Sequence, residues 1–518
     1  MKILLAVLPH FQNTSFTVAH LGNACISAYL KKYLPEDQIK TIDLRTFEDL
    51  KNVWTSKDLP QMTYLNMYVS DIYDLPFIAN IIKKYEEKKD IEHILKLDYE
   101  VIETWAKERG FYPPLIQEKL YQANITMLKY IELFKDYDVI GLSLYTSNFY
   151  LSVLASIFIK IKYPNTKIVF GGSQITQGDT SREILIKSEL ADFIVIGEGE
   201  EPMLQIIKNL KSNSPSEDVI GVKTKNNFDR LDTFSQSANL EELPIPDYDD
   251  IDFSLFNPSV IPIYSNRGCP FRCHFCSEHS LFGKKFKRRS PQKVLEDMKL
   301  LSKKYKISEF TIADSLINSS EQWLEEFTEI LNQEKEKFLW GGYFRAEMSD
   351  ILINNMKKAG LNSAILGVES FSQETLDNMN KRKINNETLS TIRALIENNI
   401  HAFVNIFTGY PEEKEEDFQD TYRISNELFD EFKAKNKAQY YHITARSFQL
   451  RPFSNIYNDY DKFGLDVESW SKYYNEKYYP DYFKNIFEIT LCSFKIKKLP
   501  LFKIQNRIMT MKKLKKLK

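Results

Sequence analysis

Runs of consecutive apolar residues alternate along the chain with segments in which apolar residues recur every three or four positions. The first run is KILLAVL, and the runs of this kind stand at residues 2–8, 38–44, 138–145, 166–172 and 191–200. A short, continuous apolar run is typical of a strand buried on both faces, and the three-to-four spacing is typical of a helix. Strands that alternate with helices predict a doubly wound parallel α/β domain over residues 1–205.

Helical periodicity fills the intervals between these runs. It extends over 17–34 and 148–163, and it dominates the long interval 45–135, for example in IANIIKKYEEKKDIEHILKL. An interval of this length exceeds an ordinary connection between two strands of one sheet. We therefore predict a helical insertion near 45–135 in the first domain.

A polar segment separates the first series of elements from a second one. Residues 206–258 contain Pro244 and Pro246, followed by four aspartates within six residues, and predict a linker with room for one hairpin. Candidate strands then follow at 260–266, 308–314, 338–344, 363–368, 401–408 and 440–449. Helical patterns lie between them at 291–304, 321–333, 350–359, 385–398 and 415–428.

Six strand–helix units of this kind predict a partial (βα)6 barrel, similar to a TIM barrel, over residues 259–455. Ser290 and Pro291 suit the cap and the first position of a helix. Residues 456–518 are rich in Tyr and Lys and predict an α-rich C-terminal extension.

The composition of the chain argues against several classes of function. The chain has 518 residues and a formal net charge of −2, so no global charge favours nucleic acid, and no nucleic acid partner is expected. The basic run at 284–289 is interpreted as a solvated connection. We find no window of about 18 uncharged apolar residues, so no transmembrane segment is predicted, and the apolar start is too short for a signal peptide. A cytoplasmic location is expected.

Three of the five cysteines lie within the segment NRGCPFRCHFCSEH, as Cys269, Cys273 and Cys276. So few cysteines do not make a disulfide framework, and their clustering indicates a metal site in a reducing compartment. One alternative is a zinc site completed by His274 or His279, which would indicate a zinc-stabilised binding protein. The other is a 4Fe-4S cluster with one open iron. The two remaining cysteines, Cys25 and Cys492, are interpreted as buried bystanders.

The spacing Cys-x3-Cys-x2-Cys, with an aromatic residue before the last cysteine, resembles the signature of the radical S-adenosylmethionine (SAM) superfamily. The resemblance implies that Cys269, Cys273 and Cys276 hold a 4Fe-4S cluster. It also implies that the open iron binds the amino and carboxylate groups of SAM, whose one-electron cleavage yields a 5′-deoxyadenosyl radical that abstracts hydrogen.

Other segments are similar to motifs of the same superfamily. By this resemblance, Asp314 in IADS meets the SAM amino group, Arg345 pairs with the SAM carboxylate, and Glu369 in GVES accepts the ribose hydroxyls. A helix cap for Asp314 and a surface ion pair for Arg345 remain open. In FTGYPEE, Glu412 replaces the second glycine of the family's Gly-x-Pro-Gly-Glu turn, which puts the adenine contact there in doubt.

The first domain resembles the cobalamin-binding domain that often precedes a radical SAM barrel. The matching segments are LGNACISAYLKKYLP, GLSLYTSN, FGGSQIT, DFIVIGEGE and ELPIPDYD. The resemblance implies that Gly171 and Gly172 let the nucleotide tail of cobalamin pass close to the backbone and that Ser143 bonds to this tail. The cobalt-ligating pattern Asp-x-His-x-x-Gly is absent, and His10 lacks its surroundings.

These observations predict a cobalamin-dependent radical SAM enzyme that modifies, for example methylates, an unactivated carbon. A cobalamin-free rearrangement, cyclisation or cross-linking enzyme is the alternative within the same family. The substrate stays open among peptides, lipids and precursors of natural products or cofactors. A reductant such as flavodoxin or ferredoxin is the expected protein partner.

Overall fold

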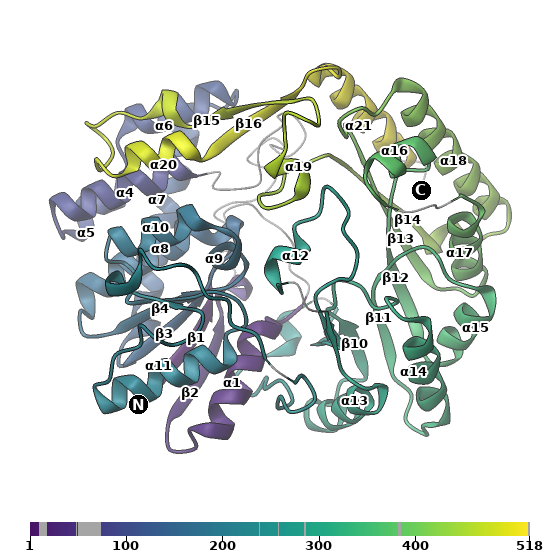
Figure 1. Ribbon diagram of the computed structural model, residues 1–518, viewed down its shortest axis with the longest axis horizontal. Coiled ribbons are helices and arrows are strands. Elements are labelled where there is room, and N and C mark those ends of the chain that lie inside the picture. The colour runs from purple at the N-terminus through teal and green to yellow at the C-terminus, as the bar shows by residue number, and fades with distance from the viewer. Residues whose placement is uncertain are drawn as a thin grey trace.

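The computed structural model describes residues 1–9, 18–47, 49, 74–237, 239–256, 258–283, 286–381 and 385–515. Residue His10, part of the predicted insertion and the start of the basic run at 284–289 lie outside this set. Two α/β units stand side by side, and the C-terminal residues run along one edge of both (Figure 1). The predicted fold class is confirmed, because both units contain a parallel sheet flanked by helices.

The first sheet has the strand order β2-β1-β3-β4-β5-β6. Its strands are β1 (Lys2–Val7), β2 (Gln38–Asp43), β3 (Val139–Ser143), β4 (Lys167–Gly171), β5 (Phe193–Val195) and β6 (Val222–Lys223). The first five are parallel and β6 is antiparallel to β5. In β1, Ile3 and Leu5 belong to one core and Leu4 and Ala6 to another, which explains the continuous apolar run.

Helices cover both faces of this sheet. Helices α1 (Leu21–Tyr33) and α11 (Glu200–Ser212) lie on one face, and α8 (Phe149–Lys162), α9 (Ser173–Gln177) and α10 (Asp179–Lys187) lie on the other. The described part of the insertion consists of α4 (Leu75–Glu87), α5 (Ile91–Leu95), α6 (Tyr99–Glu108) and α7 (Pro113–Tyr130). These helices share one core with α8, so the insertion enlarges the first domain.

The end of the first domain lies beyond the predicted residue 205. That residue falls inside α11, and β6 still pairs with β5 of the first sheet. The chain then crosses to the second unit through a segment that stays close to the first, since the Asp247 backbone amide donates to Ala24 at 3.0 Å. The predicted linker is therefore packed against α1.

The second sheet has the order β14-β13-β12-β11-β10-β7, and all its strands are parallel. They are β7 (Ile261–Ile263), β10 (Glu309–Ile312), β11 (Leu339–Phe344), β12 (Leu361–Glu369), β13 (His401–Thr408) and β14 (Tyr441–Ser447). No pairing between β7 and β14 closes the described sheet, so it is a partial barrel.

Helices cover the outer face of this barrel. They are α13 (Pro291–Tyr305), α14 (Glu321–Gln333), α15 (Asp350–Lys358), α17 (Asn385–Glu397) and α18 (Glu415–Ala434), whereas α16 (Gln373–Asn378) packs in a separate core with the C-terminal extension. Ser290 caps α13 by accepting from the Lys293 amide, which confirms the predicted start of that helix. Alternate residues of β13, such as Val404 and Ile406, pack under the helices, so its other residues face the barrel interior.

The C-terminal extension joins the two units. It contains α19 (Asn455–Asn458), β15 (Leu465–Ser469), α20 (Phe483–Ile489), β16 (Leu491–Ile496) and α21 (Leu501–Lys515). Residues of α20 belong to the core of the first domain, and Leu465, Phe494 and Ile496 of the β15–β16 ribbon pack beside the barrel. The extension bridges the insertion and the barrel (Figure 1).

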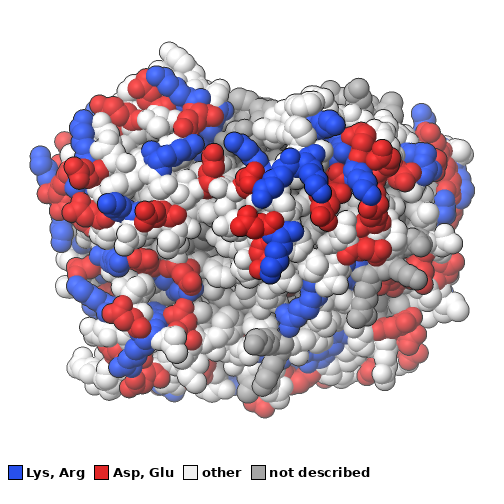
Figure 2. All heavy atoms as spheres, turned by 45° about the horizontal axis from the view of Figure 1, so that its top comes forward, with Lys and Arg blue, Asp and Glu red and all other residues white. Residues whose placement is uncertain are grey.

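The described surface carries both signs of charge. On the face drawn in Figure 2, basic and acidic side chains are interspersed rather than gathered into regions of one sign. Among the described residues, we find no helix that combines the length and the apolar character needed to cross a membrane.

Candidate functional site

The three clustered cysteines lie on a loop with a two-stranded neck. Strand β8 (Asn266–Arg267) pairs with β9 (Lys287–Arg288), and the loop between them carries the cysteines and the short helix α12 (Glu278–Leu281). All three thiols are free, and Cys273 is buried. Burial raises the pKa of Cys276 to about 12 and also raises that of Cys269. Burial therefore favours the protonated form of Cys276 and Cys269, and a metal that binds them would have to displace these protons.

The number of clustered thiols matches the three protein ligands of a 4Fe-4S cluster with one open iron. Among the described side chains, we find no group of three or more His, Cys, Asp or Glu that is arranged around one metal ion. A tetrahedral zinc site, with Zn–S bonds of about 2.3 Å, requires its sulfurs to converge closely. A 4Fe-4S cluster spreads three thiolates over three corners, so three free thiols on one loop fit it.

Aromatic and backbone contacts fix the loop over the barrel. The Phe275 ring lies 5.1 Å from that of Phe407 on β13. The backbone amide of His274 donates to the Met379 carbonyl at 2.9 Å, and the His274 carbonyl accepts from Ile456 at 3.1 Å. The cysteine loop is thus held by the barrel and by the C-terminal extension together.

Asp314 follows β10, as predicted, and its carboxylate is turned toward the neck of the cysteine loop. It accepts from the Ser265 and Asn266 amides at 2.8 and 3.1 Å and from the Asn266 side chain at 2.6 Å. Burial raises its pKa to about 6. These contacts make Asp314 a support for the residues just before Cys269, and its contact with SAM stays a prediction.

Arg345 lies against the cysteine loop. Its guanidinium is 4.1 Å from the centroid of the Phe271 ring and pairs with Glu347 at 2.9 Å. The buried Nε atom has no hydrogen-bond partner. Burial raises the pKa of Cys269, and the positive charge of Arg345 acts in the opposite direction. The ion pair that the sequence left open as an alternative is present as this pair with Glu347, although the Arg345 side chain itself is only 8% exposed.

Glu369 and Glu412 both stand in strained turns at the carboxyl ends of barrel strands. Glu369 has φ +67° and pairs with Lys381 at 2.8 Å, so its carboxylate is already partnered. Glu412 has φ +72°, a left-handed conformation that suits the glycine of the family's turn. The next residue, Glu413, is buried and pairs with Arg507 of α21 at 2.7 Å.

A cavity of about 440 Å³ lies at the carboxyl ends of the first sheet, where the barrel faces it. Ser143, Gly171 and Gly172, predicted from different segments, all line it. Gly172 has φ +98°, and a Cβ atom there would lie 2.8 Å from the Leu144 carbonyl oxygen. The close approach of two backbones therefore requires glycine at this position.

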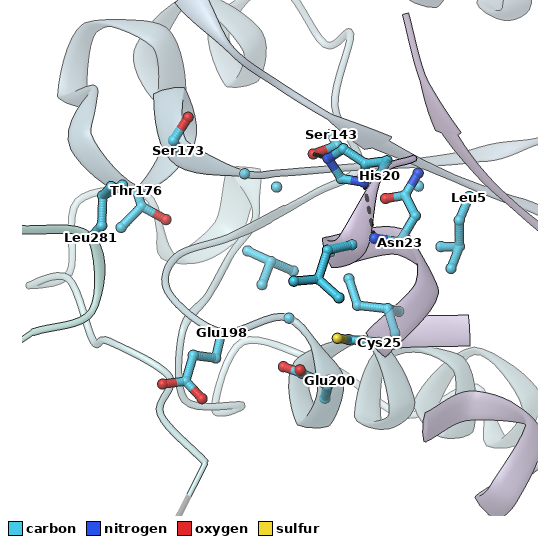
Figure 3. Close-up of a pocket in the computed structure, with 18 of the residues that line it drawn as sticks. Leu5, His20, Asn23, Cys25, Ser143, Ser173, Thr176, Glu198, Glu200 and Leu281 are labelled. Atoms are coloured by element: carbon cyan, nitrogen blue, oxygen red, sulfur yellow. Dashed lines mark hydrogen bonds between the residues drawn. The ribbon is translucent and has the colours of Figure 1, made fainter. Parts of the chain in front are cut away.

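Two further groups of cavity residues were not predicted from the sequence (Figure 3). His20 caps α1 by accepting from the Asn23 amide at 3.0 Å through Nδ1, so its Nε2 carries the proton toward Tyr145 and Ser143, at 2.7 and 3.2 Å. The other group is an ion-pair network of Glu198 and Glu200 with Arg267. Its residues lie within the quoted segments DFIVIGEGE and NRGCPFRC, but their pairing depends on how the domains pack.

Comparisons with known proteins agree with this architecture. Residues 263–424 match the Radical SAM superfamily. An uncharacterised methyltransferase from Pyrococcus horikoshii is 24% identical over 57% of this chain and 65% of its own length. The anaerobic magnesium-protoporphyrin IX monomethyl ester cyclase of Cereibacter sphaeroides is 28% identical over 51% of this chain and 45% of its own length. The chain thus spans between about half and two thirds of these relatives.

A solved structure covers nearly the whole chain. It is the radical S-adenosylmethionine methyltransferase TsrM from Kitasatospora setae with cobalamin and a [4Fe-4S] cluster bound, with a TM-score of 0.61 and 12% identity over 99% of this chain and 88% of that one. At this identity the likeness shows the fold, in which an α/β domain precedes a partial barrel.

Proposed function

Because residues 263–424 match the Radical SAM superfamily, we propose that the chain is a cobalamin-dependent radical SAM enzyme that methylates an unactivated carbon. The observation that carries the proposal is a shared interface: Asn266, Arg267, Leu281 and Phe282 of the cysteine loop and its neck line the cavity of the first domain. A cofactor in that cavity would therefore border a cofactor on the cysteines. The resemblance to a methyltransferase named in the comparisons supports the reaction class.

In this proposal the cysteine loop binds the cluster, and residues at the ends of the barrel strands bind SAM. Cys269, Cys273 and Cys276 hold the cluster, which supplies the single electron that cleaves SAM to a 5′-deoxyadenosyl radical. Arg345 offers positive charge to the SAM carboxylate, because its guanidinium already lies near Cys269. The Glu369 carboxylate would accept hydrogen bonds from the ribose hydroxyls while it stays paired with Lys381. Asp314 would orient the neck and meet the SAM amino group.

The first domain would bind cobalamin, which carries the methyl group, through its cavity. Gly171 and Gly172 leave room for the nucleotide tail, and Ser143 would bond to it. Ser143 and Tyr145 orient His20, whose Nε2 proton makes it a donor. Since that nitrogen carries a proton, His20 is assigned to hydrogen bonding in this cavity and not to ligation of cobalt.

The test is oxygen-free reconstitution with iron, sulfide and hydroxocobalamin. We expect about four irons and one cobalamin per chain, with 5′-deoxyadenosine and S-adenosylhomocysteine both formed from SAM. Alanine at Cys269, Cys273 or Cys276 should abolish cluster binding, while Cys492→Ala, which alters a buried thiol in the extension, should not. Zinc without sulfide, or persistence of the cluster in the three variants, would refute the proposal.

The alternative is a cobalamin-free enzyme that forms a ring or a cross-link. The similarity to a protein named as a cyclase favours it. It predicts 5′-deoxyadenosine without S-adenosylhomocysteine and a protein that does not retain cobalamin. In both cases a flavodoxin or ferredoxin is the proposed reductant, and the substrate class of peptide, lipid, or natural-product or cofactor precursor follows from product analysis.

A further inference from the structure

The neck of the cysteine loop is tied to the first domain by charged side chains. Arg267, on β8, donates to Glu198 at 2.6 Å through Nη1 and to Glu200 at 2.5 Å through Nη2. Lys287, its partner on β9, donates to the other oxygen of Glu198 at 2.7 Å. Both strands of the neck therefore bind carboxylates that follow β5 of the first sheet. We call these four residues the neck clamp.

The neck clamp is shielded from water. The side chains of Arg267, Glu198 and Glu200 are 10%, 3% and 5% exposed. Although burial by itself would raise it, the pKa of Glu198 lies below its ordinary value because of the Arg267 guanidinium. Because these side chains are buried, breaking one of the ion pairs would leave an uncompensated charge away from water. The clamp therefore has few alternative arrangements.

The same residues form part of the cavity wall. Glu198, Glu200 and Arg267 line the cavity, and so do Leu281 and Phe282 from the far limb of the cysteine loop. Cys269 is two residues from Arg267 along the chain. An occupant of the cavity would thus contact the neck clamp directly, and a cluster on the cysteines would be joined to it through the short segment between Arg267 and Cys269; Figure 3 shows Glu198 and Glu200 at the cavity.

We propose that the neck clamp couples the two sites, so that cobalamin in the cavity and the cluster on the cysteine loop each strengthen binding of the other through Arg267. The inference rests on the proposed function, since it needs both cofactors. Thermodynamic linkage requires the effect to be reciprocal. Arg267, Glu198 and Glu200 are then positioning residues, because they act on the cofactors through the loop and the cavity wall.

The chain offers a matched control for Arg267. Arg289 is also buried, and its guanidinium lies 4.7 Å from the Tyr264 ring, against 5.0 Å for that of Arg267. It pairs with Asp297, inside the barrel, instead of with the first domain. Arg289→Lys therefore alters a comparable buried ion pair that forms no salt bridge to the first domain.

The experiment measures the Kd of hydroxocobalamin for the cluster-loaded and the cluster-free protein. For the wild type we expect the cluster to lower the Kd by at least about fivefold, a ratio at the lower end of typical coupling. In Arg267→Lys the ratio should fall to about one while cobalamin still binds, and in Arg289→Lys it should stay at the wild-type value. The EPR signal of the reduced cluster should shift on cobalamin binding in the wild type and in Arg289→Lys only.

Should Arg267→Lys not fold, Glu200→Gln removes one carboxylate and should reduce the ratio at least twofold. The coupling would be overturned by a wild-type Kd ratio of one, by an unchanged ratio in Arg267→Lys or Glu200→Gln, or by an equal loss in Arg289→Lys. Any of these results would leave the proposed function standing. A wild type that binds no cobalamin with or without its cluster would overturn both.

Discussion

The buried pair between Glu413 and Arg507 fastens α21 to the barrel and gives a quantitative test of the structure. The Glu413 carboxylate accepts from the Gly409 amide at 2.6 Å, from the Thr408 hydroxyl at 2.8 Å and from Arg507 at 2.7 Å. The two side chains of the pair are 2% and 3% exposed. Burial raises the pKa of Glu413 to about 7 in spite of Arg507.

The change Arg507→Met keeps much of the side-chain length and removes the charge. At pH 8 it leaves a buried carboxylate without its cation, and we expect a loss of about 3 kcal/mol in the free energy of local opening of α21. Because a raised carboxyl pKa means that the folded state binds the proton more tightly, the cost of burying Glu413 grows as the pH rises from about 4.5 to 7. At pH 6 the carboxyl is mostly protonated, so the loss should shrink to about 1.6 kcal/mol.

Hydrogen–deuterium exchange measured on peptides of α21 reports this opening directly. A loss of about 3 kcal/mol corresponds to a fall in protection of more than about a hundredfold. Adding Glu413→Gln to Arg507→Met should restore most of the protection at pH 8. Arg423→Met, which breaks exposed pairs with Asp420 and Glu427 on α18, should change protection less than about threefold. Equal losses at pH 6 and pH 8, or no recovery in the double variant, would refute the reasoning.

Three further changes test other parts of the structure. Gly172→Ala should weaken cobalamin binding at least tenfold in equilibrium dialysis and cost about 1–3 kcal/mol of stability, because the position is left-handed and its Cβ would meet the Leu144 backbone; an unchanged Kd would contradict this. Glu412→Gly should stabilise the barrel by about 1 kcal/mol in calorimetry, since it relieves a left-handed backbone at φ +72°; a fall in Tm would contradict this. Burial raises the pKa of Asp74 to about 7. In the wild type, the protection of α4 against hydrogen exchange should therefore decline as the pH rises from about 4 to 7. In Asp74→Asn this decline should be absent.

The major strands could be predicted because each is buried on both faces or alternates between a core and an interior. Two kinds of element were not predicted from the sequence. The strands β6, β8 and β9 have two residues each, too few for any periodicity, and they form because neighbouring loops hold them. The β15–β16 ribbon lies in a Tyr-rich segment whose apolar residues divide between two cores, so its pattern matched neither a strand nor a helix.

The candidate site, like the fold, was predicted only in part from the sequence. The spacing of the three cysteines predicted a shared loop, and the family resemblance pointed to Ser143, Gly171 and Gly172, which lie at the ends of β3 and β4 and line the cavity. The pairing of Arg267 with Glu198 joins residues 69 positions apart, and only the packing of the domains brings them together. Asp314 was correctly located at a strand end, yet no sequence pattern indicated that its carboxylate supports the neck through Ser265 and Asn266.

The C-terminal extension has a consequence for how the protein is made. Asn80 of α4 donates to the carbonyl of Tyr478, 398 residues later, and Trp470, Phe483 and Phe487 complete the core of the first domain. At about 5–20 residues per second, the ribosome needs on the order of half a minute to bridge that interval. During this time the emerging α4 and α6 lack their covering residues, so the nascent chain is exposed to aggregation and is a natural client for chaperones.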